Sequence, residues 1–248
     1  MCTVSWVHNE NGYQLLCNRD EKRTRLPATP PTIQNLDGVL YLAPTDGAFG
    51  GSWIAVNEFG VTLALLNRHV ASLSGTTSRG QLIRTFGASR SVDEVRQKAQ
   101  RVDFSSFAGF TLATLEVGKR CSLFEWDGRN LVSSQDAEHR MPLTSSSFDP
   151  DGVEEMRLQE FSSRARAAGR VDANLLLTFH QSHGLGTEAP SAYSTCMHRP
   201  DAHTVSFTRI DVSHTEVSFF YSSAAPCVPA PGETLRLARK VSALVPCG

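Results

Sequence analysis

The sequence predicts an α+β protein in which two antiparallel sheets are covered on their outer faces by helices. The expected elements run in the order strands, helices, strands, helices, strands. A parallel doubly wound sheet would instead require strict alternation of strand and helix. Hairpin signals in the first third of the chain favour antiparallel pairing from the start.

The first expected element is a hairpin at the amino terminus. Residues 2–7 and 13–18 are rich in β-branched and aromatic side chains, and an Asn-Gly dipeptide lies between them at 11–12. This dipeptide is the strongest short-range signal for a tight hairpin turn. A turn centred on it sets Cys2 opposite Glu21. A slip of one pair would still leave Cys2 beside the same charged cluster.

The remaining elements follow from alternating apolar runs, turn residues and helix caps. Further strands are expected over residues 39–43, 53–56, 61–67, 110–117, 121–125, 130–132, 193–198, 205–212 and 215–222. Helices are expected over residues 79–86, from the capping box Ser91-Val-Asp-Glu94 to about residue 102, and over 153–168 and 172–180. Residues 141–147 are expected to form a loop, 26–31 a stiff Pro-rich connector and 228–248 a loose tail.

Composition favours a single domain over residues 1–248 and excludes some partners. The chain has 24 Lys+Arg and 25 Asp+Glu, a net charge of -1, so no long-range field draws it to nucleic acid or to an anionic membrane. No apolar run approaches the roughly 18–20 residues that span a bilayer, and the amino terminus does not resemble a signal peptide. We therefore expect a cytoplasmic protein with no membrane insertion and a small-molecule substrate. The sequence does not specify an oligomeric state.

Neither the cysteines nor the histidines are spaced as metal ligands usually are. The six cysteines contain no CxxC pair, which argues against a disulfide framework and against a zinc site. The histidines show no ligand spacing either, so neither a metal nor a cofactor is predicted. The histidines considered were His180, His183, His198 and His203.

Cys2 differs from the other cysteines because of its position. Initiator methionine is generally removed before a small residue, so the mature chain is expected to begin at Cys2. One residue would then carry a thiol and an α-amine whose ordinary pKa is about 7.7–8.0, which suits a general base at neutral pH. The sequence therefore places a nucleophile and a base together at the amino terminus.

The hairpin supplies charged neighbours for this pair. A cation beside the sulfur favours the thiolate, and a carboxylate beside the amine orients it. Strand alternation puts Cys2, Arg19 and Glu21 on one face and Asp20 on the other. An alternative interpretation of these residues is a solvated charge run at a strand end.

These residues resemble a known family. Met1-Cys2 at the start of a strand, followed by Asn18-Arg19-Asp20-Glu21, is similar to the NRDE family, which includes the transport-and-Golgi-organisation proteins; residues 50–54 and 63–67 extend the match. That family is similar to the cysteine branch of the N-terminal-nucleophile hydrolases, among them bile salt hydrolases, penicillin V acylases and isopenicillin N acyltransferases. The resemblance implies a four-layer αββα sandwich. It is clear to about residue 70.

The resemblance assigns roles to individual residues. Cys2 resembles the nucleophile, Arg19 the cation beside the thiol, and Asp20 the carboxylate that holds the α-amine. In bile salt hydrolases the matching Arg and Asp are two residues apart, so Glu21 is an alternative for the last role. Asn67 matches a residue whose backbone N–H contributes to the oxyanion hole.

Three further residues are auxiliary candidates. Ser145 follows Leu-Thr where those hydrolases have a second oxyanion donor, an asparagine. Arg199 offers the only counterpart to a late arginine, and Asn18 belongs to the NRDE cluster itself.

Two functions follow from these resemblances. The first is an N-terminal cysteine amidohydrolase or acyltransferase that forms a thioester on Cys2. The alternative is a non-catalytic binding or trafficking protein for haem or a lipid-like ligand.

Overall fold

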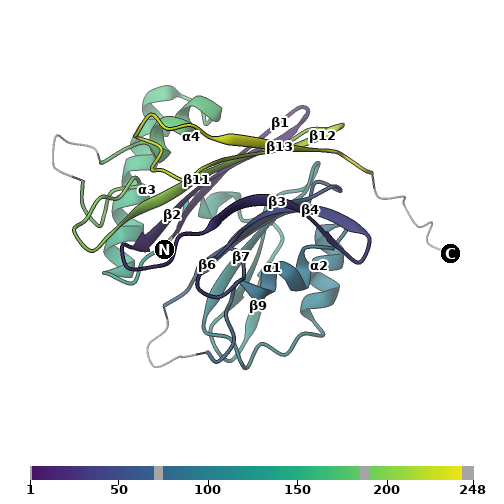
Figure 1. Cartoon of the computed structure of the whole chain (residues 1–248). Coiled ribbons are helices and arrows are strands. Elements are labelled where there is room, and N and C mark those ends of the chain that lie inside the picture. Colours follow the sequence, from purple (N-terminus) through teal and green to yellow (C-terminus); the bar gives the residue numbers. More distant parts are fainter. Residues whose placement is uncertain (1, 70–74, 185–189, 242–248) are drawn as a thin grey trace.

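Two antiparallel sheets stack face to face in the computed structural model, which describes residues 2–69, 75–184 and 190–241 (Figure 1). Within these ranges the first sheet has the strand order β10-β1-β2-β11-β12-β13 and the second β3-β4-β5-β6-β7-β8-β9. The strands of the first sheet are β1 (Cys2–Asn9), β2 (Gly12–Lys22), β10 (Leu143–Ser145), β11 (Ala202–Val212), β12 (Glu216–Ser222) and β13 (Glu233–Ala238). Those of the second are β3 (Thr29–Leu36), β4 (Val39–Thr45), β5 (Ile54–Asn57), β6 (Thr62–Asn67), β7 (Phe110–Leu115), β8 (Ser122–Trp126) and β9 (Leu131–Ser134).

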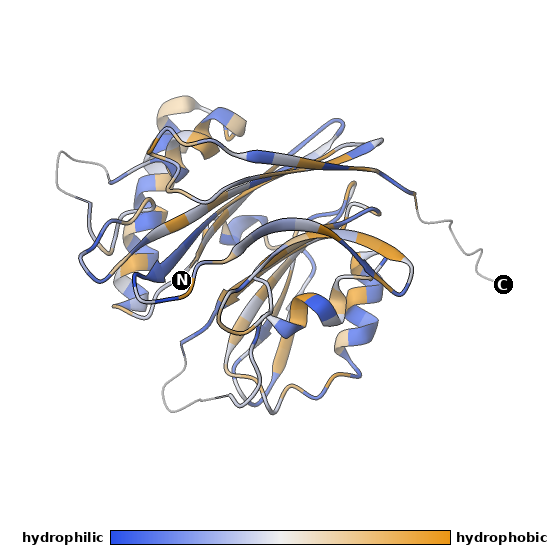
Figure 2. Cartoon of the chain, viewed as in Figure 1, coloured by the Kyte–Doolittle hydropathy of each residue, from blue (hydrophilic) through white to orange (hydrophobic). Residues whose placement is uncertain are grey.

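Helices cover the outer face of each sheet, which confirms the predicted four layers. The helices are α1 (Gln81–Phe86), α2 (Val92–Ala99), α3 (Pro150–Ala168) and α4 (Ala173–His180), with a 3-10 turn at Glu138–Arg140. Helices α3 and α4 bury Phe161 and Phe179 against the first sheet, whereas α1 and α2 bury Ile83 and Val95 against the second. A third core, which includes Trp6, fills the space between the sheets. Figure 2 shows hydrophobic residues along both sheets and on the helices that cover them.

The amino-terminal hairpin forms as predicted, but its register differs by two residues. Asn9 pairs with Gly12, so the turn centres on residues 10–11 and Cys2 lies opposite Arg19 rather than Glu21. Gly12 begins β2 at a φ of 153°, and a Cβ there would lie 1.9 Å from the carbonyl oxygen of Val212. Gly12 is therefore needed for close packing of β11 and not for the turn. The shift is even, so the predicted face of every side chain is kept.

Three strands lie where the sequence predicted irregular chain. The connector at 26–31 runs into β3, and the loop at 141–147 contains β10, which pairs Ser145 with Cys2. The tail prediction for 228–248 is wrong over β13, which pairs with β12, while residues 242–248 lie outside the described residues. β3 was not predicted because prolines at its start argue against a strand, although edge strands tolerate them. β10 was not predicted because it has only three residues.

The strand predicted over residues 193–198 is wrong. This segment is irregular apart from one bridge between His198 and His203. Side chains, and not a neighbouring strand, donate hydrogen bonds to its backbone carbonyls. Asn18 donates to the oxygen of Thr195, and Arg157 donates to the oxygen of Tyr193. Hydrogen bonds from side chains elsewhere in the fold thus replace the strand pairing that the local sequence pattern predicted.

The helix predictions hold in position. The serine of the predicted capping box accepts a hydrogen bond from the backbone N–H of Glu94, which fixes the start of α2. Among the described residues no helix combines the length and apolar character that a membrane span requires.

Candidate active site

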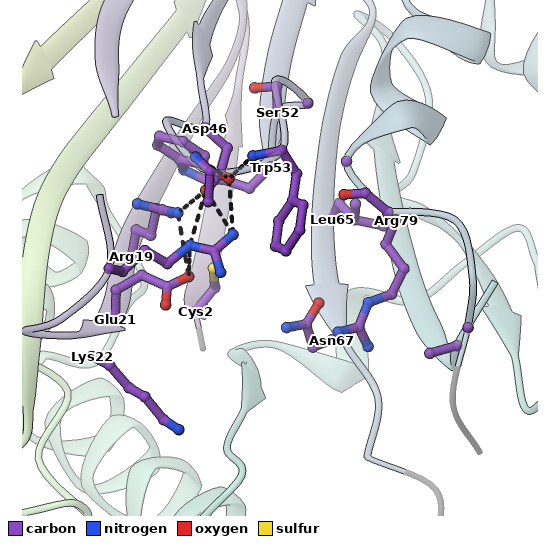
Figure 3. Close-up of a pocket in the computed structure, with 18 of the residues that line it drawn as sticks. Cys2, Arg19, Glu21, Lys22, Asp46, Ser52, Trp53, Leu65, Asn67 and Arg79 are labelled. Carbon is purple, nitrogen blue, oxygen red and sulfur yellow. Dashed lines mark hydrogen bonds and ion pairs between the residues drawn. The ribbon is translucent and has the colours of Figure 1, made fainter. Parts of the chain in front are cut away.

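A pocket of about 740 Å³ opens between the two sheets beside the start of β1 (Figure 3). Its wall is mixed in character: β2 contributes the charged Arg19, Glu21 and Lys22, whereas the apolar Leu65 lies in β6 and the apolar Trp53 directly precedes β5. The lining side chains labelled in Figure 3 are Cys2, Arg19, Glu21, Lys22, Asp46, Ser52, Trp53, Leu65, Asn67 and Arg79. Residues from the amino terminus, from β2 and from the second sheet therefore meet in one cavity.

Cys2 occupies the first position of β1 and reaches this pocket. Its side chain is buried, with 6% of the residue exposed, between β2 and β10. Its backbone nitrogen donates to Ser145 Oγ at 3.0 Å. That nitrogen becomes the α-amine once Met1 is removed, so Ser145 contacts the group that would act as base.

The thiol of Cys2 lies among groups that favour its ionised form. A hydrogen bond from the Cys17 thiol, which lies on the same face of the hairpin, is the main cause that holds the pKa of Cys2 below its ordinary value; the Arg19 guanidinium acts in the same direction. The bond to Cys2 and burial together raise the pKa of Cys17. The pKa shifts of the two thiols therefore favour the thiolate on Cys2 over the thiolate on Cys17.

Arg19 is fixed in place from three sides. Its Nη2 lies 2.6 Å from Oδ2 of Asp46 and 3.2 Å from Oε1 of Glu21, and its guanidinium stacks 4.2 Å from the centre of the Trp53 ring. Arg25 pairs with the same carboxylate of Asp46. This network holds the positive charge of Arg19 on the same side of the pocket as Cys2.

Asp20 lies on the opposite face of β2, as strand alternation predicted. Its Oδ1 accepts a hydrogen bond from Thr204 Oγ1 at 2.7 Å, and its Oδ2 lies 3.4 Å from Arg157 Nη2 of α3. Arg157 also donates to Thr3 and Thr144, which flank Cys2 and Ser145. Burial raises the pKa of Asp20, and the Arg157 charge partly offsets this. A buried ion pair thus anchors the strands that carry the amino terminus.

Asn18 has a structural position outside the pocket. Its side-chain nitrogen donates to the backbone oxygens of His180 and Thr195, and its Oδ1 meets His180 Nδ1 at 2.9 Å. His180 Nε2 in turn lies 2.9 Å from Ser5 Oγ. Asn18 therefore joins β2 to α4 and to the irregular segment that follows it.

The other predicted residues divide between the pocket and its surroundings. Asn67 ends β6 on the pocket wall, and its side chain faces the Cys2 side (Figure 3). Ser145 lies beside Cys2, and its Oγ accepts the hydrogen bond from the Cys2 nitrogen. Arg199 is not among the pocket lining; it pairs with Asp201 and stacks on Phe148.

Three important residues were missed at the sequence level. Asp46, Trp53 and Arg157 become partners of the amino-terminal cluster only through tertiary contacts. Trp53 belongs to the matched run 50–54 and was recognisable as a motif residue, but without a role. Arg157 is one of many arginines in its region, and nothing local distinguishes it.

Arg19 provides a direct test of the thiol environment. Replacing Arg19 with Gln is expected to raise the pKa of Cys2 and to slow its alkylation by iodoacetamide at neutral pH by about tenfold, because the thiolate loses its cation. The rate is measured against pH on protein that begins at Cys2, with peptide mapping of the adduct. Arg25→Gln, which contacts the same carboxylate of Asp46, is the matched control. Identical pH profiles for wild type and Arg19→Gln would contradict the assignment.

The arrangement of two antiparallel sheets between outer helices is a fold like that of the N-terminal-nucleophile hydrolases. The whole chain is similar to penicillin V acylase from Agrobacterium tumefaciens (TM-score 0.57, 11% identity, 95% of this chain and 86% of that one). It is also similar to a variant of conjugated bile acid hydrolase from Clostridium perfringens (TM-score 0.55, 10% identity, 98% and 99%). A third similar structure is the Caenorhabditis elegans orthologue of N-acylethanolamine-hydrolyzing acid amidase (TM-score 0.53, 14% identity, 92% and 94%). These identities are low, so the likeness establishes the fold alone.

The family follows from the sequence itself. The model of the Transport and Golgi organisation 2 family matches residues 1–162, and the chain belongs to that family. No curated protein matches the sequence. The resemblance read from residues 18–21 is therefore confirmed at the level of family and fold.

Proposed function

We propose that this protein is an N-terminal cysteine amidohydrolase or acyltransferase that acts on a small acyl or amide substrate. The observation that carries the proposal is the position of Cys2, with its thiol beside Arg19 in the pocket and its backbone nitrogen bonded to Ser145. The likeness to three amide hydrolases supports it at the level of fold.

Each step of the proposed reaction uses a group at this site. The α-amine of Cys2 takes the thiol proton, and the sulfur attacks the acyl carbon to form a tetrahedral intermediate. The backbone N–H of Asn67 stabilises its oxyanion. The carbon–nitrogen bond then breaks, the proton passes from the α-ammonium to the leaving amine, and a thioester remains on Cys2. Water or an acceptor amine attacks this thioester and restores the thiol.

Turnover of a substrate panel tests this proposal. We expect protein that begins at Cys2 to hydrolyse at least one member of a panel of activated esters and N-acyl amides, and Cys2→Ala to lower that rate by at least about 10³-fold, since the nucleophile is removed. Cys121→Ala is the matched control, because Cys121 is buried outside the pocket lining. Absence of turnover over the whole panel, or equal rates in Cys2→Ala, would contradict the proposal.

The alternative of a haem or lipid-like ligand has less support from the pocket. Its described wall carries the charged side chains Arg19, Glu21, Arg25, Asp46 and Arg79, and the apolar part of a haem or lipid-like ligand would cover them without offering hydrogen bonds. Retention of such a ligand by the Cys2→Ala variant, together with no turnover in the wild type, would favour this alternative.

A further inference from the structure

Four potential metal ligands converge outside the pocket, on the far side of β2 and β11. Within the described residues, the ligand atoms of His183, Cys196, His198 and Cys227 all lie within 4.8 Å of one another. His183 follows α4, Cys196 and His198 lie in the irregular segment before β11, and Cys227 follows β12. The cluster thus joins three segments that are distant in the sequence.

The spacing of these ligand atoms fits a metal ion with tetrahedral coordination. His198 Nε2 lies 3.5 Å from Cys196 Sγ and 3.1 Å from Cys227 Sγ. A tetrahedral zinc site with Zn–S of about 2.3 Å and Zn–N of about 2.0–2.1 Å places neighbouring sulfur and nitrogen ligands about 3.5 Å apart. The His183 and His198 rings approach edge to face with their centres 5.2 Å apart, and each offers a ring nitrogen to the cluster.

The chemistry of the donors selects the ion. Two thiolates and two imidazoles with no carboxylate form the Cys₂His₂ set that structural zinc sites use. Four protein ligands leave no open position for a substrate, which distinguishes a structural site from a catalytic one. Cys196 is fully buried, while His198 and Cys227 are half-buried and His183 is exposed, so an ion can enter from the His183 side.

We propose that His183, Cys196, His198 and Cys227 bind one structural Zn²⁺. The assignment of these ligands does not rest on the proposed chemistry at Cys2. It differs from the sequence-based prediction of no metal, because the Cys-Met-His run and the long gaps on either side match no familiar ligand motif.

Zinc at this position would stabilise the supports of the active site. The segment that carries Cys196 and His198 also supplies the Thr195 carbonyl to Asn18 and the Ala192 carbonyl to Arg157. Met197 pairs through its backbone with Thr204, whose hydroxyl donates to Asp20. An ion that fixes this segment therefore acts on the strand β2 that holds Arg19 beside the thiol.

Metal content tests the site directly. We expect the full chain, purified without a metal-affinity column from cells supplied with zinc, to retain about one Zn²⁺ per chain after dialysis, measured by mass spectrometry of the elements. Cys196→Ser and Cys227→Ser should each lose the metal. Cys121→Ser and His139→Gln, which alter a buried cysteine and an exposed histidine outside the cluster, should retain it.

Cobalt substitution keeps the test decisive if the variants fail to fold. Co²⁺ titrated into metal-stripped wild type should give the absorption of a tetrahedral thiolate site, and Zn²⁺ should displace it. Wild type that binds neither ion at one equivalent would overturn the proposal. A Cys196–Cys227 disulfide in freshly purified protein, or zinc retained by both serine variants, would overturn it as well.

Discussion

Protein with an uncleavable extension before Cys2 is expected to turn over acyl substrates at least about 10²-fold more slowly than protein that begins at Cys2. The extension converts the α-amine into an amide, which removes the general base and a contribution of about 10²–10⁴ to the rate. The Cys2 nitrogen still donates to Ser145 as an amide, so the fold is expected to survive. Steady-state rates of both forms on one ester substrate measure the effect.

The control for this experiment is an extension that a specific protease removes to leave Cys2 first. Cleavage should restore the rate, and equal thermal unfolding of the extended and cleaved forms separates loss of the base from loss of the fold. Equal activity before and after cleavage would contradict a catalytic role for the α-amine.

The second large effect is expected on stability, at the buried pair of Asp20 and Arg157. Arg157→Met should lower the free energy of unfolding by about 3–5 kcal/mol, because the buried Asp20 carboxylate loses its guanidinium partner where both side chains are 0–1% exposed. The hydrogen bonds of Arg157 to Thr3 and Thr144 are lost with it. Denaturant unfolding at neutral pH measures the change.

The pH dependence of this variant follows from the sign of the Asp20 shift. Burial raises the pKa of Asp20 above its ordinary 3.8, and removal of Arg157 raises it further. A folded pKa above the unfolded one means that the folded state binds the proton more tightly, so stability falls as the pH rises through this window. The difference in free energy of unfolding between wild type and Arg157→Met should therefore become smaller as the pH is lowered towards the folded pKa of Asp20.

Arg170→Met is the matched control for charge and size. Its partner Asp172 is at the surface and the Arg170 side chain is 77% exposed, so little change in stability is expected. A similar free-energy change for both variants would contradict the importance of the buried pair.

The fold was predictable from sequence because its strongest signals are local. The alternation in residues 2–18, the capping box at α2 and the hairpin of β5 and β6 all agree with the structure. The failures came where a distant partner decides the outcome. The close approach of the Val212 carbonyl requires a glycine at position 12. Gly12 therefore lies in β2 and pairs with Asn9, which changes the register of the hairpin from the predicted one.

Strand alternation predicted the site only as far as one hairpin reaches, and the family resemblance added Asn67 and Ser145. Alternation alone placed Cys2 and Arg19 on one face and Asp20 on the other, because the error in register was even. Asp46 and Arg157 are brought to this hairpin by the second sheet and by α3. No periodicity in their own segments marks them, since their importance depends on packing between layers.

The position of an acyl group on the protein shows whether Cys2 is the nucleophile. Protein that begins at Cys2 is mixed with an activated acyl ester, quenched in acid within one turnover, digested and mapped by tandem mass spectrometry. We expect acylation on the sulfur of Cys2 as a thioester that hydroxylamine removes, with Cys17 unmodified. Acylation spread over lysines, or carried by Cys17 with Cys2 unmodified, would contradict it.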